Sequence, residues 1–281
     1  MAIAMLAACA RKSETVVSAP VLVTADSGTG ASLASPPDLV RDARAQTAPR
    51  KLALLVVEIG QLEALAKQGS AGPDTPHLLR RLADDYAELE AAGLNSSTPA
   101  STSRSSASSG GQATAVANQR ATIDRRCRVA VIHYYEALLG NYPSYAELDA
   151  ASYYLAYTYE RSGDLSNAGR VYSDLISNFQ NSQYVPLAHF GLGEIAFRES
   201  DADPTKLSIA RNGYQKATRW PPLANDAYGW AWVRLAQVLE RQGDRRQAKT
   251  AYATALAFAQ QNPIAPASSG IAEAIPSWAQ P

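Results

Sequence analysis

The side chains that could carry out catalysis are few and scattered along the chain. His77, His133 and His189 have no second histidine or cysteine three or four residues further on, the spacing with which a helix holds a zinc ion. The carboxylates of Asp84 and Asp85 occupy adjacent positions, which point in different directions on a helix. Phosphate-binding glycine loops and the Gly-x-Ser-x-Gly nucleophile motif are missing from the sequence. We therefore predict a protein that is not an enzyme and needs no cofactor, metal or small-molecule substrate.

One cysteine has neighbours that could make it reactive. Cys127 lies in the run Arg125-Arg126-Cys127-Arg128. Positive charge stabilises a thiolate and so lowers the pKa of a cysteine. A lone cysteine in a helical pattern is also a common packing residue, because a thiol behaves as a small hydrophobe. The sequence leaves both interpretations open.

The other cysteine ends a short apolar run at the start of the chain. Leu6-Ala7-Ala8-Cys9 resembles the lipobox of a bacterial lipoprotein signal. The resemblance implies cleavage before Cys9 and acylation of its thiol by a lipid such as palmitate. Because no Asp follows Cys9, it also implies an outer-membrane location facing the periplasm. The alternative is a chance run of small residues.

Two further features bear on this signal. A signal peptide carries a basic segment and an apolar stretch of roughly 7 to 15 residues, and both are cut short here, so we expect a start codon further upstream. No run of the sequence approaches the ~18 apolar residues of a spanning helix. The membrane attachment that we expect is therefore through lipid only.

Composition separates the packed part of the chain from the rest. The 281 residues are 46% hydrophobic, enough for a packed core. Residues 10–46 and 95–119 are instead rich in Ser, Ala, Gly and Pro or Thr, without the apolar periodicity that offsets the entropy of ordering, and we expect both to be flexible. The 26 basic and 26 acidic residues balance, so no long-range field favours nucleic acid.

A motif recurs in the packed part. Glu160-Arg161-x-Gly163-Asp164 returns as Glu240-Arg241-x-Gly243-Asp244, and in both copies Ala and Tyr follow at matching offsets. Apolar residues at helical spacing precede each glycine and resume after it, which predicts two helices joined by a short turn. Repeated helical hairpins of this kind bind partners along a surface.

The spacing of small and large residues resembles the tetratricopeptide repeat. In that family small residues at the eighth and twentieth places let two antiparallel helices approach, as Ala156 with Ala168 and Ala236 with Ala248 do here. The resemblance implies an all-α solenoid of helical hairpins, with a flexible N-terminal tether. A middle copy has a lengthened internal turn around residues 200–204, and an earlier copy is split by a Ser-rich insertion. The predicted organisation is a signal at 1–9, a tether at 10–46, a capping helix and the first helix of the split hairpin at 47–94, the insertion at 95–119, hairpins at 120–263 and a tail, which we expect to be frayed, at 264–281.

The family resemblance also implies where a partner binds. In tetratricopeptide proteins the inner groove is lined by the first helix of each hairpin, at its second, fifth, ninth, twelfth and thirteenth places. The groove residues predicted in this way are Tyr153, Tyr157, Glu160, Arg161, Phe190, Glu194, Phe197, Arg198, Trp230, Val233, Gln237 and Arg241. Trp232 falls at a core position of the repeat, whereas Trp230 falls at a groove position.

Three arginines occupy the thirteenth place of consecutive hairpins. Arg161, Arg198 and Arg241 form a column that could grip the carboxylates of an extended acidic peptide, because a guanidinium offers paired donors. Each also lies in the last turn of its helix, where a cation interacts with the helix dipole and its stem covers apolar neighbours. Both interpretations of the column stay open.

Other short runs narrow the family resemblance. Tyr153-Tyr154-Leu155-Ala156-Tyr157 and Tyr184-Val185-Pro186 are similar to segments of bacterial envelope repeat lipoproteins, among them those of β-barrel assembly, of periplasmic division coordination and of gliding machinery. The resemblance implies a scaffold that binds envelope proteins or peptides. The alternatives are a soluble cytoplasmic adaptor or chaperone-like module, and a recruiting subunit for a cell-wall enzyme.

Overall fold

The computed structural model describes residues 52–68, 72–95, 110–222, 225, 227–263, 268 and 270–280, and these residues fold into helices and their connections. Cys9, the predicted tether at 10–46 and residues 96–109 of the predicted insertion lie outside the described residues. The helices are α3 (Leu52–Lys67), α4 (Thr75–Asn95), α5 (Gly110–Asn141), α6 (Leu148–Ser162), α7 (Leu165–Asn178), α8 (Val185–Glu199), α9 (Lys206–Ala217), α10 (Tyr228–Arg241), α11 (Arg245–Gln261) and α12 (Ile271–Ala274), followed by the 3-10 helix η3 (Ser277–Ala279).

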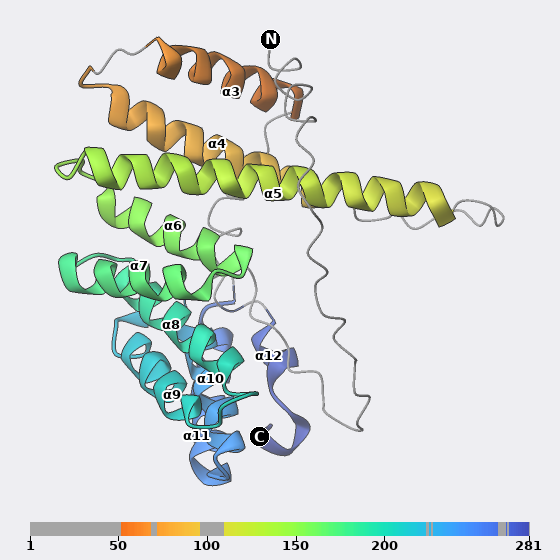
Figure 1. The fold of residues 1–281 in the computed structure, drawn as a ribbon. Coiled ribbons are helices and arrows are strands. Elements are labelled where there is room, and N and C mark those ends of the chain that lie inside the picture. The colour runs from red at the N-terminus through yellow and green to blue at the C-terminus, as the bar shows by residue number, and fades with distance from the viewer. Residues whose placement is uncertain are drawn as a thin grey trace. The chain divides into compact units, whose positions relative to one another are not determined.

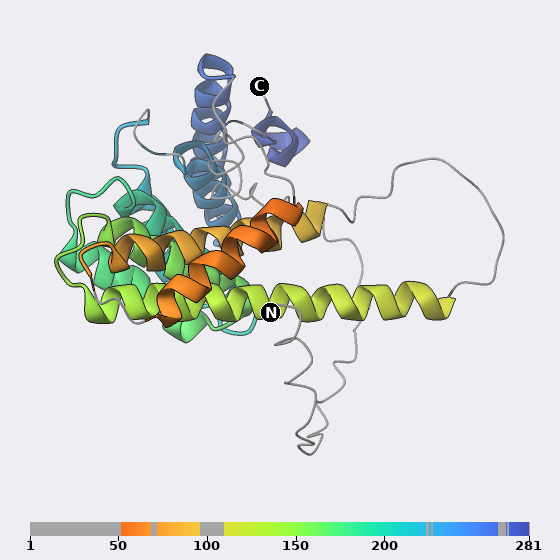
Figure 2. The ribbon, with the colours of Figure 1, turned by 90° about the horizontal axis from the view of Figure 1, so that it is seen from above.

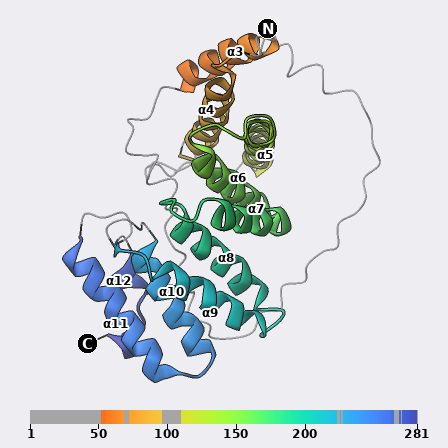
Figure 3. The same ribbon diagram turned by 90° about the vertical axis from the view of Figure 1, so that its left-hand side faces the viewer.

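Successive helices pair as antiparallel hairpins. The hairpins are α4 with α5, α6 with α7, α8 with α9, and α10 with α11, and each contacts the next through α5 and α6, α7 and α8, or α9 and α10. Figure 1 and Figure 3 show the helices following one another in chain order from α3 to α11. The prediction of an all-α solenoid of helical hairpins is confirmed.

The repeated Gly-Asp pair makes the turn inside two hairpins. Gly163 adopts a left-handed conformation with φ of 85°, and the N–H of Asp164 donates to the carbonyl of Tyr159 at 3.0 Å. The Asp164 carboxylate then caps α7 by accepting from the backbone N–H of Asn167 at 3.1 Å. Gly243 and Asp244 repeat this arrangement between α10 and α11, with φ of 83° at the glycine. One dipeptide thus ends one helix and begins the next.

The middle hairpin closes through a tighter helix contact. A Cβ on Gly213 of α9 would lie 2.9 Å from the carbonyl oxygen of His189 and 3.0 Å from the backbone of Gly193 on α8. Glycine at 193 and 213 therefore allows the two backbones to approach closely. The longer turn of this hairpin is held by Asp203, whose carboxylate accepts from the N–H and hydroxyl of Thr205.

Helix α5 begins earlier than the sequence boundary at 120. It starts at Gly110 and runs for 32 residues, so residues 110–119 of the predicted insertion are helical. Alanines at 113, 115 and 117 have high helix propensity and extend the helix toward its N-terminus. Figure 1 and Figure 2 both show this end of α5 projecting past α4.

The described part of the C-terminal tail is packed, which corrects the expectation of a frayed end. Helix α12 contacts α10 and α11, and η3 contacts α11. Ile271, Ile275 and Ala279 are buried there, and the indole of Trp278 meets the ring of Tyr252 edge-on. The last hairpin of a solenoid leaves an apolar face open, and this segment covers it.

Candidate partner-binding face

The three arginines of the predicted column each reach back to the preceding hairpin. Arg161 Nη2 lies 3.3 Å from Glu90 Oε1, and Arg198 forms an ion pair with Glu160. Arg241 Nη1 donates to Asp201 at 2.8 Å. The column therefore braces consecutive hairpins, a role that neither sequence interpretation included.

The arginines lie nearer to solvent than two of their partners. The Arg198 side chain is 47% exposed and that of Glu160 is 16% exposed. Arg161 is likewise more exposed than Glu90, whereas Asp201, the partner of Arg241, is well exposed. The ring of Tyr157 lies beside the guanidinium of Arg161, with 5.8 Å between the ring centroid and Cζ. We call Tyr157, Arg161, Arg198 and Arg241 the arginine face.

Tyrosines from the second helices hold the carboxylates beneath this face. Tyr172 donates to Glu160 at 3.0 Å, and Tyr252 donates to Glu240 at 3.3 Å in the last hairpin. Burial raises the pKa of Glu160 to about 7, with the nearby Glu194 acting in the same direction and Arg198 opposing it. The pKa of Glu160 is therefore shifted toward neutral pH.

In the α8–α9 hairpin the twelfth place is Phe197, which has no carboxylate. The tyrosine of the second helix therefore donates to a different residue, Glu194. Tyr214 donates to Glu194 at 2.6 Å. The guanidinium of Arg234 on α10 binds both oxygens of Glu194, at 2.8 and 3.0 Å, and also donates to Gln237 at 2.8 Å. This network joins the α8–α9 hairpin to the α10–α11 hairpin. The family positions did not point to Arg234, because they describe one repeat at a time.

Half of the predicted groove residues face the interior. Phe197 is buried under Arg241, whose Cζ lies 4.2 Å from the ring centroid. The buried residues of the predicted set are Tyr153, Phe190, Phe197, Trp230, Val233 and Gln237. They pack the stack and present no open surface, which corrects their assignment to the lining of the groove.

The two tryptophans of α10 have the reverse of the expected environments. Trp230, predicted for the groove, is 1% exposed, and Trp232, predicted for the core, is only partly buried. The C-terminal segment contributes to the burial of Trp230, because α12 contacts α10 and Gly270 lies close to the Trp230 ring. A segment distant in sequence therefore adds to the burial of one of the two indoles.

Stacked helical hairpins with small residues where the two helices cross are typical of repeat proteins. Two segments match the tetratricopeptide repeat family. They are residues 150–182, which hold most of α6 and α7, and 230–258, which hold most of α10 and α11. A solved structure described as the crystal structure of BtubC (BKLC) from P. vanneervenii is 12% identical, with a TM-score of 0.44, and the match covers 81% of this chain and 93% of that one. No curated protein matches the sequence.

The tetratricopeptide repeats indicate the general class of function. This family generally serves as a protein-protein interaction module without catalysis, and its stacked hairpins offer an extended binding surface. Within the part of the chain that the structure describes, no three His, Cys, Asp or Glu side chains are grouped so as to hold a metal ion. No helix in that same part is both long and apolar enough to cross a membrane.

Cys127 has the environment of a packing residue. Its side chain is buried, and burial, with Glu90 and Asp124 nearby, raises the pKa of the thiol to about 12. Arg128 lowers this pKa, but its guanidinium pairs with Glu90 at 2.9 Å. The thiol is therefore protonated at neutral pH, and burial outweighs the adjacent arginines.

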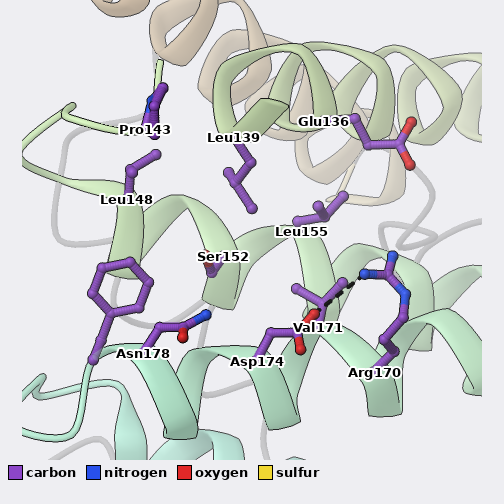
Figure 4. Close-up of a pocket in the computed structure, with 11 residues that line it drawn as sticks. Glu136, Leu139, Pro143, Leu148, Ser152, Leu155, Arg170, Val171, Asp174 and Asn178 are labelled. Carbon is purple, nitrogen blue, oxygen red and sulfur yellow. Dashed lines mark hydrogen bonds and ion pairs between the residues drawn. The ribbon is translucent and has the colours of Figure 1, made fainter. Parts of the chain in front are cut away.

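Two open cavities lie between the second helices of neighbouring hairpins. One, of about 430 Å³, is bounded by α5, α6 and α7, with Leu139, Leu155 and Val171 in its wall and the Arg170–Asp174 pair at 3.3 Å on its rim (Figure 4). The other, of about 550 Å³, lies at the equivalent place between α9, α10 and α11 and contacts Trp232. Their recurrence at one position of the repeat indicates that they arise from the stacking of hairpins.

Proposed function

We propose that this protein is a non-catalytic scaffold that binds acidic, extended segments of partner proteins along the arginine face. The observation that carries the proposal is the alignment of Arg161, Arg198 and Arg241 on consecutive hairpins, with Glu90 and Glu160 more deeply buried than their arginine partners. A guanidinium held by a buried carboxylate is oriented before a partner arrives. Less side-chain entropy is then lost on binding.

The chemistry of the face favours a peptide with spaced carboxylates. Arginine binds a carboxylate through parallel N–H donors, and arginines on successive hairpins repeat that donor set along the solenoid. Tyr157 adds an aromatic surface beside Arg161. The ring of Phe197 packs against the guanidinium of Arg241 and helps to hold it in position.

We further propose that the protein works in a bacterial cell envelope, lipidated at Cys9 and held at the periplasmic face of the outer membrane. The support is the lipobox-like Leu6-Ala7-Ala8-Cys9 together with the composition of residues 10–46, which suits a tether. Its partners there would be envelope proteins.

The binding proposal is tested with a labelled peptide of about ten residues that carries Asp and Glu, and with its Asn and Gln counterpart. Fluorescence anisotropy compares the intact protein with Arg198→Gln combined with Arg241→Gln. We expect at least about tenfold weaker binding of the acidic peptide by this variant, and weaker binding to the intact protein as salt increases.

The matched control is Arg170→Gln combined with Arg246→Gln, two exposed arginines on the second helices α7 and α11. This variant has the same charge change and should keep the affinity of the intact protein. Equal losses in both variants would show that only overall charge matters, and the arginine face would then not be the binding site.

The envelope proposal has a separate test. In a bacterium that expresses the gene with its upstream region, a palmitate analogue should label the protein and the Cys9→Ser variant should stay unlabelled. Crosslinking in intact cells, followed by purification from the membrane fraction, would then identify partners. Labelling that persists in the variant, or recovery of the intact protein only from the cytosol, would contradict lipidation at Cys9.

A further inference from the structure

The first described helix has an exposed apolar face. Five of the eight large apolar side chains that are exposed in the described residues lie on α3. Leu54 and Val57 are 61% and 57% exposed. At the other end of the stack α12 and η3 cover the last hairpin. The two ends of the solenoid therefore differ, and the end formed by α3 carries the apolar surface.

The acidic side chains of α3 are turned away from this face. Glu58 accepts from Arg81 on α4 at 2.8 Å, and Glu63 accepts from Tyr86 on α4 at 2.7 Å. Lys67, in the last turn, is the helix's remaining charged residue and lies 3.7 Å from Glu63. The middle of the exposed face thus has no charge that would select an acidic or a basic partner.

Helix α3 carries two seams with the spacing of helix-helix contacts. The inner seam, at 55, 59, 62 and 66, faces α4, and its first two residues are buried. The outer seam is Leu54, Val57, Gln61 and Ala64, separated by three, four and three residues, and all four are exposed. Alternating intervals of three and four are typical of residues that pack between two helices. A helix with apolar residues on both sides is typical of the interior of a bundle.

The chemistry of the outer seam favours another helix over a lipid surface. Membrane-interface helices use aromatic anchors and basic residues on a polar face. Helix α3 contains no aromatic residue and one lysine. Its outer seam combines aliphatic, small and uncharged polar residues, which is the composition of a helix-packing surface.

We propose that two copies of this chain associate through the outer seams of their α3 helices, packed antiparallel about a two-fold axis near position 59. In that register Leu54 faces Ala64 of the second copy, and Val57 faces its Gln61. Each large residue then meets a smaller or more flexible one, and Gly60 beside the axis allows close approach. A charge-free face is complementary to itself, as a two-fold interface requires.

The first test is the oligomeric state of the full chain carrying Cys9→Ser, which removes the proposed site of lipidation. Sedimentation velocity from about 1 to about 100 μM should show a concentration-dependent dimer, because a single helix pair is a small interface. Val57→Glu buries a charge at the seam and should raise the dissociation constant at least about tenfold. A monomer at every concentration would overturn the proposal.

The control is Ile209→Glu, which changes an exposed apolar residue on α9 and should leave the dimer intact. Both changes are at exposed positions, and circular dichroism verifies that both variants stay folded. If Ile209→Glu weakens the dimer as much as Val57→Glu, the interface is not at α3.

The register has its own test in the Cys9→Ser background. Val57→Cys protein mixed with Gln61→Cys protein should form a mixed disulfide faster than either forms a disulfide with itself. Faster self-linking of Gln61→Cys would indicate parallel helices and overturn the antiparallel arrangement. Flotation of monomeric protein with uncharged phosphatidylcholine vesicles, abolished by Val57→Glu, would assign the face to lipid instead and overturn the dimer.

Discussion

Glu160 shows how the stack changes the chemistry of a side chain that looks ordinary in the sequence. It belongs to a repeated Glu-Arg pair, but the arginine that pairs with it is Arg198 of the next hairpin. Tyr172 donates to its other oxygen. Burial with a second carboxylate nearby favours the protonated form, although Arg198 favours the charged one. The balance makes this carboxyl sensitive to pH near neutrality.

We predict that the stability of the protein decreases as pH rises from about 4.5 to about 7, through this residue. The folded-state pKa of Glu160 is about 7 against an unfolded value of 4.5, so the folded state binds the proton more tightly in this window. The free energy of unfolding in urea should fall between pH 5 and pH 8 by about 2 kcal/mol more in the intact protein than in Glu160→Gln. If the stability of both proteins depends equally on pH, Glu160 does not have the raised pKa.

A second prediction at this scale concerns Cys127. Because its thiol is buried and protonated, a disulfide reagent should react with it in the folded Cys9→Ser protein at least about a hundredfold more slowly than in urea. The absorbance of the released thiolate follows the reaction. Rapid modification of the folded protein would mean that the nearby arginines, and not burial, control this thiol.

At the scale of single elements, the turns are set by local sequence. Gly163→Ala places a side chain at φ of 85° and should lower the free energy of unfolding by about 1 to 2 kcal/mol. The control is Gly140→Ala in α5, where a Cβ meets nothing within 4 Å and alanine is the better helix former. Gly140→Ala should therefore be neutral or stabilising. Urea unfolding measures both, and the absence of a difference would contradict the role given to Gly163.

The C-terminal segment is an element that only packing explains. Ile271→Ala removes a fully buried side chain between α12 and the last hairpin and should cost about 2 to 5 kcal/mol. Trp230 should become more exposed, with a red-shifted fluorescence. Ala272→Ser, on the exposed side of α12, should leave both properties unchanged. Unchanged stability in Ile271→Ala would show that this segment does not cover the last hairpin in solution.

At the scale of the whole molecule, polar contacts with little exposure to solvent join consecutive hairpins. Arg234→Met leaves the Glu194 carboxylate buried without its guanidinium and should lower stability by about 3 to 5 kcal/mol. Adding Glu194→Gln removes the unpaired charge and should recover part of that loss. Urea unfolding of the single and double variants provides the measurement. Additive losses would mean that the two residues do not act as a pair across the hairpins.

The local features of this fold could be predicted because their causes are local. Helical periodicity and the Gly163-Asp164 and Gly243-Asp244 turns depend on residues within about one or two turns of each other, so the sequence predicts these hairpins correctly. The tetratricopeptide spacing is likewise a property of one repeat. The roles of residues outside the described part, including the lipidation of Cys9, stay predictions from sequence alone.

The composition of the candidate site, in contrast, depends on which repeats are neighbours. Glu90 and Arg161 are separated by the insertion and by all of α5, and their pairing exists only after the hairpins stack. Trp230 and Trp232 occupy similar sequence contexts, and α12, which contacts α10, lies on the side of the buried Trp230. Local periodicity therefore determined the helices and turns, whereas contacts between distant segments decided the ion pairs, the buried indole and the exposed face of α3, because burial depends on every element that packs against a residue.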